Sequence, residues 1–244
     1  MNRDERRDLD AYLKRIAARI GPVAAMPLTP HSVICPGAKA CRAGCFARQD
    51  NYLNNNVQWK RFASYLFTRS NEFVDTMDWE IKHARMTQHV EEPDGSICGV
   101  KQVGFPYKYR IHDSGDFYTS PGDSGTHNVF AYRDKWFEIC RRNPGTLFWA
   151  YTKSVWQFKS SRTQWRSMPD NLRIILSGGG SYDHWIDPVR DPHSFVFTSH
   201  EELYAKGYAD ATVNDGDVVF DSHLVGLVYH GSPKLAAEIT KDAS

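Results

Sequence analysis

The stretch TLFWAYTKS, residues 146–154, runs from a continuous apolar segment into a short polar end. YKYRIHDSG, residues 107–115, and NLRIILSGGG, residues 171–180, are built in the same way, and a helical pattern lies between each pair. Continuous apolar runs are typical of strands buried on both faces, and strands that alternate with helices form parallel sheets. The three stretches therefore predict an α/β fold in which helices cover a parallel sheet.

Further strands and helices are predicted on both sides of this region. Residues 31–35 form a short predicted strand, and apolar residues at helical spacing predict an N-terminal helix over residues 3–20. The other predicted helices cover 57–70, 71–86, 129–145, 155–168, 201–208 and 233–241, and the other strands 194–200, 209–214 and 224–231. About six βα units are too few for a complete eight-stranded barrel. The predicted fold is therefore a partial (β/α)6 TIM-like barrel with an N-terminal helix.

The length of 244 residues fits a single domain over residues 1–244. Within it we expect an N-terminal helix and lead-in, a partial barrel, a cysteine loop inside that barrel, and a C-terminal helix. These parts cover residues 1–30, 31–230, 35–45 and 231–244 respectively.

The composition excludes several classes of protein. A net charge of +1 gives no electrostatic footprint for DNA or for an anionic membrane. No apolar run is long enough for a membrane span, and the charged N-terminus lacks the apolar centre of a signal peptide. We therefore expect a cytoplasmic protein with reduced thiols and no membrane partner.

The predicted strands end in polar groups that are suited to binding or chemistry. Ligands bind at the carboxyl ends of parallel strands, because the loops there are free to vary. Candidate residues at these ends are His112, Asp113, Ser114, Gly115, Asp116, Thr152, Lys153, Ser154, Ser177, Thr198 and Asn214. A site at this edge of the sheet is therefore predicted.

Cys35, Cys41 and Cys45 lie in a loop that follows the first predicted strand. Five cysteines in a chain expected to be cytoplasmic make a disulfide framework the poorest interpretation. The spacing Cys-x5-Cys-x3-Cys differs from that of common zinc fingers, and a structural zinc site needs a fourth ligand. Three thiolates can instead hold a four-iron cluster with one iron left open. Iron–sulfur cluster, zinc and unligated thiols all stay open on the spacing alone.

Three motifs resemble those of a known family. CPGAKACRAGCFA, residues 35–47, RIHDSGDFY, residues 110–118, and LFWAYTKS, residues 147–154, occur in the order found in the phage gene product 88 family. The resemblance runs from about Ile34 to Asn214 and implies a protein encoded by a phage or prophage and acting in the bacterial host.

The layout also resembles that of radical S-adenosylmethionine (radical SAM) enzymes, which place a three-cysteine loop after the first strand of a partial barrel. The resemblance implies a [4Fe-4S] cluster on Cys35, Cys41 and Cys45, with His112, Asp113 and Lys153 as catalytic candidates. It further implies that S-adenosylmethionine contacts Phe46, Ser114, Gly115, Asp116, Thr152, Ser154, Ser177, Thr198 and Asn214. Two departures are the longer gaps between the cysteines and an Asp, Asp116, where the superfamily has Glu.

Two functions from different classes follow. The first is reductive cleavage of S-adenosylmethionine for radical chemistry on a small-molecule or nucleotide substrate, with flavodoxin or ferredoxin as electron donor. The second is a zinc- or cluster-stabilised protein without turnover that binds a nucleotide or nucleic acid. Basic and aromatic residues interleave in WQFKSSRTQWR, residues 156–166, as stacking and phosphate contacts would require. A third possibility is a phage decoy or inhibitor that keeps the barrel without its chemistry.

Overall fold

A computed structural model provides the structure of the chain. It describes residues 35, 37–39, 41, 45, 54–86, 88–91, 97–101, 107–112, 114–118, 131–159, 167–212 and 215–229. The predicted N-terminal and C-terminal helices lie outside these residues, as do most of the strand predicted over 31–35 and three candidate site residues, Phe46, Asp113 and Asn214.

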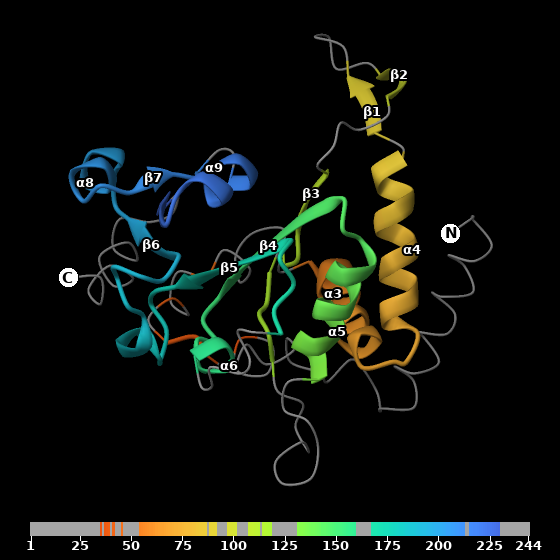
Figure 1. Cartoon of the computed structure of the whole chain (residues 1–244), viewed down its shortest axis with the longest axis horizontal. Helices are drawn as coiled ribbons and strands as arrows, with labels where there is room; N and C mark the ends of the chain where they lie inside the picture. The colour runs from red at the N-terminus through yellow and green to blue at the C-terminus, as the bar shows by residue number, and fades with distance from the viewer. Residues whose placement is uncertain are drawn as a thin grey trace, which may run out of the picture.

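A parallel sheet of six strands forms the centre of the described structure and curls into a half-barrel (Figure 1). Its strands stand in the order β3-β4-β5-β6-β8-β7. Their bounds are β3 Tyr107–Arg110, β4 Thr146–Thr152, β5 Leu172–Ser177, β6 His193–Phe197, β7 Ala209–Asp210 and β8 Leu224–Val228. The α/β class and the partial-barrel form of the sheet are therefore confirmed.

The helices have the bounds α3 Asn55–Thr68, α4 Phe73–Met86, α5 Ala131–Arg142, α6 Trp156–Lys159, α8 His200–Ala205 and α9 Asp215–Asp221. A 3-10 turn, η5, covers Asp183–Trp185. The helix predicted over 155–168 is helical at 156–159, and residues 160–166 lie outside the described part.

A short antiparallel hairpin follows α4, and no strand predicted from the sequence covers it. Strand β1, Gln88–Glu91, pairs with β2, Ile97–Lys101. Its position next to α4, away from the half-barrel, is visible in Figure 1. The segment EEPDGS is polar and turn-forming, which favours a loop. Each of the two strands is too short to show a clear alternation of apolar and polar residues.

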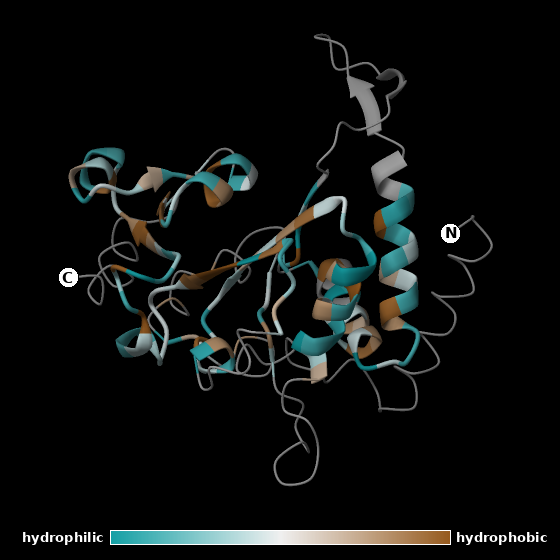
Figure 2. Ribbon diagram, in the orientation of Figure 1, coloured by the Kyte–Doolittle hydropathy of each residue, from teal (hydrophilic) through white to brown (hydrophobic). Residues whose placement is uncertain are grey.

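The two faces of the sheet carry separate cores because side chains alternate along each strand. On one face Phe148 and Ile174 pack with Trp136 and other residues of α5. On the opposite face Trp149 and Ile175 pack with Val219 of α9. Figure 2 shows the apolar residues gathered on the central strands, with hydrophilic residues on the outer sides of the helices.

The strand order explains why α9 lies on the face opposite α5. The chain moves in one direction across the sheet from β3 to β7 and then returns one place to β8. Crossovers between parallel strands are almost always right-handed, so a connection that runs backwards places its helix on the other face. The α9 helix is the connection from β7 back to β8, and it therefore packs on the face that contains Trp149.

Asn171 joins the end of α5 to the start of β5, and its replacement by alanine tests this junction. Its Nδ2 lies 2.9, 3.0 and 2.9 Å from the backbone oxygens of Cys140, Asn143 and Thr146. Asn171→Ala removes these three side-chain contacts and is expected to lower the free energy of unfolding by about 1–3 kcal/mol in urea denaturation. Asp170→Ala, at the exposed neighbouring position, should be nearly neutral. Equal losses in the two variants would contradict the assignment.

Candidate functional site

The cysteine loop contacts the carboxyl end of β5 through its backbone. Ala38 forms a β-bridge with Gly180, and the amide of Lys39 donates to the Gly179 oxygen at 3.3 Å. The Ser181 amide donates to the oxygen of Gly37 at 2.8 Å. The structure therefore brings the cysteine loop and the glycine-rich strand end together, as the prediction of a shared edge requires.

Gly37 fits this contact because it has no side chain. A Cβ at Gly37 would lie 2.1 Å from the backbone oxygen of Lys153, at the end of β4, which is a distance that real Cβ atoms do not adopt. Gly179, on the other side of the contact, has a φ of 83°, in the left-handed region that favours glycine. The loop therefore contacts both β4 and β5 at backbone distance.

The three loop cysteines are free and half-buried in the structure. Burial raises the pKa of Cys35, and the nearby negative charges of Asp116, Cys41 and Cys45 raise it further. The pKa of Cys41 is also raised by burial, and the Lys153 ammonium opposes that effect. The thiols are thus near enough to influence one another. Among the described residues, however, no three His, Cys, Asp or Glu side chains are arranged closely enough to hold a metal ion.

Lys153 places a positive charge beside the cysteines. Its Nζ donates to the Ser177 Oγ at 2.8 Å and to the backbone oxygen of Gly178. A Cβ at Gly179 would lie 3.5 Å from the Cβ of Cys41 and 3.9 Å from the Nζ of Lys153, so both groups border the same glycine. The Asp116 charge interacts with this ammonium, but within the described residues no carboxylate lies close enough to form an ion pair with Lys153. The ammonium is therefore bound to neutral oxygens and keeps its charge available to an anion.

Asp116 is a buried carboxylate whose hydrogen bonds all lie within the protein. It accepts from the backbone amides of Phe117 at 2.6 Å, Lys153 at 2.7 Å and Ser154 at 3.1 Å. The Thr152 hydroxyl donates to it at 2.5 Å. Burial raises the pKa of Asp116 to about 6, and these hydrogen bonds oppose the rise. Asp116 therefore fixes the end of β3 on the end of β4.

Thr152 and Ser154 belong to the same buried junction. The Thr152 Oγ1 also accepts from the Ser154 amide at 3.0 Å, and the Ser154 hydroxyl donates to the Phe117 oxygen at 2.6 Å. Both hydroxyl groups thus already have protein partners. Their predicted contacts with a cofactor, like that of Asp116, stay predictions, and each would need one of these hydrogen bonds to be exchanged.

His112 lies behind the edge, against aromatic rings. Its Nε2 lies 3.1 Å from the Tyr132 hydroxyl, and its ring meets Phe117 edge to face. Burial lowers the pKa of His112 to about 3, with a smaller contribution from the positive charge of Arg110. The neutral imidazole shares a hydrogen bond with the Tyr132 hydroxyl, so a packing role accounts for its contacts and its predicted catalytic role stays a prediction.

The remaining candidates have different local settings. Ser114 and Gly115 follow β3, and Gly115 has a φ of 89° that allows the chain to turn towards Asp116. The Thr198 hydroxyl donates to Glu202 at 2.7 Å, while Ser199 caps α8 by accepting from the Glu202 amide. Thr198 thus takes part in the start of a helix, which is the alternative role for such residues at strand ends.

Sequence reasoning missed Asp183 as a residue that orders the edge. Its two carboxylate oxygens accept from the amides of Gly179 at 2.7 Å and Gly180 at 2.9 Å. The signal was an acidic residue three positions after a glycine run, because an Asp side chain can hydrogen-bond to backbone groups three or four residues earlier. Asp183 holds the strand end in the shape that Ala38 pairs with.

The fold and the site define a parallel α/β protein of half-barrel form with a cysteine loop at the carboxyl edge of its sheet. Comparison with protein families matches residues 4–241 to the family described as gene product 88. Because the match covers most of the chain, the protein belongs to the gene product 88 family, as its motifs predicted. No curated protein and no solved structure matches the chain. Among the described helices, none has the length and apolar character needed to cross a membrane.

Gly37→Ala should detach the cysteine loop, because the new Cβ would overlap the Lys153 carbonyl. We expect alkylation of Cys35, Cys41 and Cys45 to become about tenfold faster or more, since 1.4 kcal/mol in a local opening equilibrium is a factor of ten. Peptide mass spectrometry after iodoacetamide treatment measures each rate, with buried Cys140 as internal reference.

Gly207→Ala is the matched control for this variant. Gly207 has a φ of 77°, and a Cβ there would meet no atom within 4 Å. Backbone strain should lower overall stability while the loop cysteines keep their rates. Equal acceleration in both variants would show that the effect is global.

His112→Gln should reduce the loss of stability in acid. The unfolded chain binds a proton near pH 6.5 and the folded chain near pH 3, so stability falls as the pH drops through this range. At pH 4 the wild type should have lost about 3 kcal/mol more than the variant relative to pH 7. Asp116 acts in the opposite sense below pH 6 and is common to both proteins. Parallel curves of unfolding free energy against pH would refute this.

Proposed function

We propose that the protein binds a [4Fe-4S] cluster through Cys35, Cys41 and Cys45 at the carboxyl edge of the half-barrel. The open iron would bind S-adenosylmethionine for radical chemistry on a small-molecule or nucleotide substrate of phage or prophage context. The observation that supports this most is the gathering of three thiols beside one ammonium, that of Lys153, at the edge where parallel sheets bind ligands.

The donor set fits such a cluster by its chemistry. Thiolates are the ligands of iron–sulfur clusters, and three of them leave one iron for another ligand. The half-burial of the cysteines suits a group that needs protection from water. As placed, the side chains of the described residues form no ready group of three donors. Cluster binding would therefore have to draw the sulfurs together, in the way that metal binding is coupled to the folding of small metal sites.

The proposal assigns a role to Lys153 and to Asp116, which lie next to the cysteines. Lys153 offers its ammonium to an anion, and the carboxylate of S-adenosylmethionine is the anion expected here. Asp116 holds the Lys153 amide and the end of β3, and so sets the position of that ammonium relative to the cysteines. When bound and reduced, the cluster supplies the electron for cleavage of S-adenosylmethionine.

A second candidate is a zinc- or cluster-stabilised protein without turnover that binds a nucleotide or nucleic acid. The observation in its favour is the junction around Asp116, where Asp116, Thr152 and Ser154 bind each other and the backbone. In this candidate those groups keep their internal hydrogen bonds, and the metal stabilises the loop alone.

Metal analysis tests the proposal. Protein purified or reconstituted without oxygen should be brown and contain iron and sulfide in equal amounts, because three thiolates fit a cluster. Cys41→Ala should lose both, whereas Cys140→Ala, a change in the core behind the edge, should keep them. A colourless protein that contains zinc would refute the cluster and favour the second candidate. With a cluster present, absence of cleavage products from S-adenosylmethionine under reducing conditions would refute the enzymatic part.

A further inference from the structure

An exposed aromatic group lies directly after the glycine-rich strand end. Trp185, at the end of η5, is 39% exposed, and His184 next to it is exposed as well. Ser181, four residues before Trp185, donates its amide to Gly37 of the cysteine loop. Tyr182 anchors the turn by packing on the core of the adjacent face. The aromatic pair thus borders the edge that contains the cysteines.

The geometry of Trp185 differs from that of Trp79, which is also exposed. Trp79, on α4, is 44% exposed, but His83 stacks on it at an interplanar angle of 8°. Trp185 meets His184 at 80° and Tyr182 at 56°, so neither ring lies parallel to the indole. An exposed indole without a parallel partner keeps the contact that planar ligands use.

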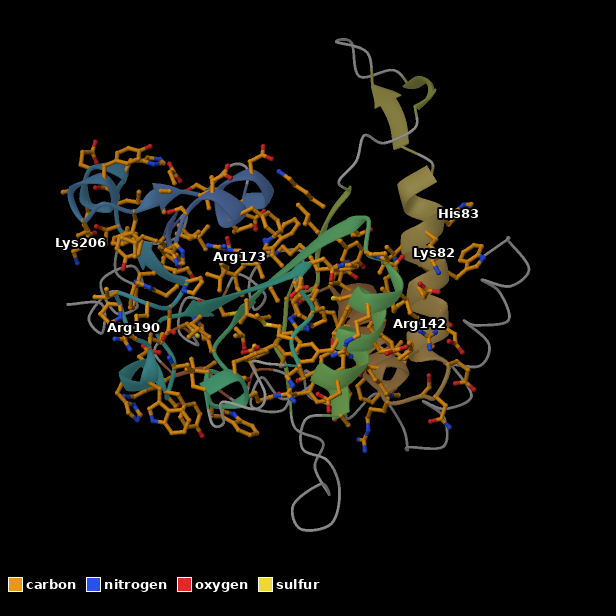
Figure 3. The ribbon with its side chains drawn as sticks, viewed as in Figure 1. Lys82, His83, Arg142, Arg173, Arg190 and Lys206 are labelled. Carbon is orange, nitrogen blue, oxygen red and sulfur yellow. The ribbon has the colours of Figure 1, made fainter. Side chains whose placement is uncertain are left out.

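The charges around η5 suit a ligand that has both a ring and a phosphate. Asp183 accepts from two glycine amides, and Asp191 pairs with Lys159 at 2.6 Å. Arg190 is the most exposed cation of this segment, with a side chain 85% exposed and its Nε 3.8 Å from Asp187. Figure 3 shows Arg190 on the opposite side of the molecule from Lys82 and His83 of α4. Arg190 follows Trp185 by five residues, and its solvated guanidinium and the open indole match the polar and planar parts of a nucleotide.

We propose that Trp185 and His184 form a stacking surface for a nucleobase at the cysteine edge, with Arg190 as the contact for its phosphate. The base belongs either to a free nucleotide or to an unpaired position in a single strand. This proposal names the class of ligand that binds at the carboxyl edge of the sheet. It rests on the proposed function for the chemistry that follows binding. Binding of the base itself needs neither iron nor S-adenosylmethionine. An experiment can therefore refute base stacking without refuting the proposed cluster, and the reverse.

The test uses the metal-free full chain labelled with 5-fluorotryptophan. Resonances are assigned with Trp185→Phe and Trp79→Phe, and spectra are recorded with AMP and with an oligodeoxythymidylate of about 12 nucleotides. The Trp185 signal should shift with at least one ligand, while the Trp79 signal stays in place. A shift with AMP alone identifies a free nucleotide, and a shift with the oligomer alone identifies a strand.

Affinity provides the second measurement. Trp185→Ala should weaken binding of the responsive ligand about fivefold or more, since stacking contributes about 1–3 kcal/mol per base. Trp185→Phe should keep part of the affinity, because it keeps a ring at the same place. Trp79→Ala should bind like the wild type. No shift of the Trp185 signal with either ligand at millimolar concentration, or equal weakening in Trp185→Ala and Trp79→Ala, would overturn the proposal.

Discussion

The site depends on one buried carboxylate. Asp116 joins the ends of β3 and β4 by accepting from three backbone amides and the Thr152 hydroxyl. A buried carboxylate without partners would be costly, but here each oxygen has two donors, and these hydrogen bonds offset part of the cost of burial. The position of Lys153, and through it that of Ser177, follows from this junction. Removing the carboxylate would leave the amides of Phe117 and Lys153 without this acceptor, whereas the Ser154 amide would keep the Thr152 hydroxyl.

The reversal of strand order has a further effect on where a ligand can lie. Because the chain reverses its direction across the sheet between β7 and β8, α9 packs on the face of the sheet that contains Trp149 and Ile175. Helices therefore cover both faces of the central strands. The carboxyl edge, with the cysteine loop, Lys153 and the η5 turn, is left as the place where polar groups gather. The polar candidate residues of the half-barrel thus lie at the carboxyl edge of its sheet.

Sequence patterns predicted the parts of the fold that depend on local chemistry. Burial on both faces requires the apolar runs of β4 and β5, and the sequence shows these runs directly. It also shows the polar residues Lys153 and Ser177 at the carboxyl ends of the two strands. The face taken by α9 depends on the order of strands far apart in the chain, which no local pattern encodes. Asp116 and Thr198 show the same limit within the site. An Asp or Thr at a strand end can bind a ligand, join two strand ends or cap a helix, and the sequence does not distinguish these roles. Trp185 was missed because one exposed tryptophan has no periodicity to reveal it.

Within the described residues the sheet is open, with β3 and β7 as its outer strands, and the outer strand of a sheet can pair with another chain and aggregate. The two edges here are short: β3 spans Tyr107–Arg110 and β7 spans two residues. Lys108 and Arg110 of β3 form ion pairs with Asp217 and Asp215 of α9, and Asp210 of β7 receives a hydrogen bond from the Thr212 amide. Short outer strands that carry charged residues are among the means by which proteins limit such pairing, so an open sheet with a polar rim need not be prone to aggregation.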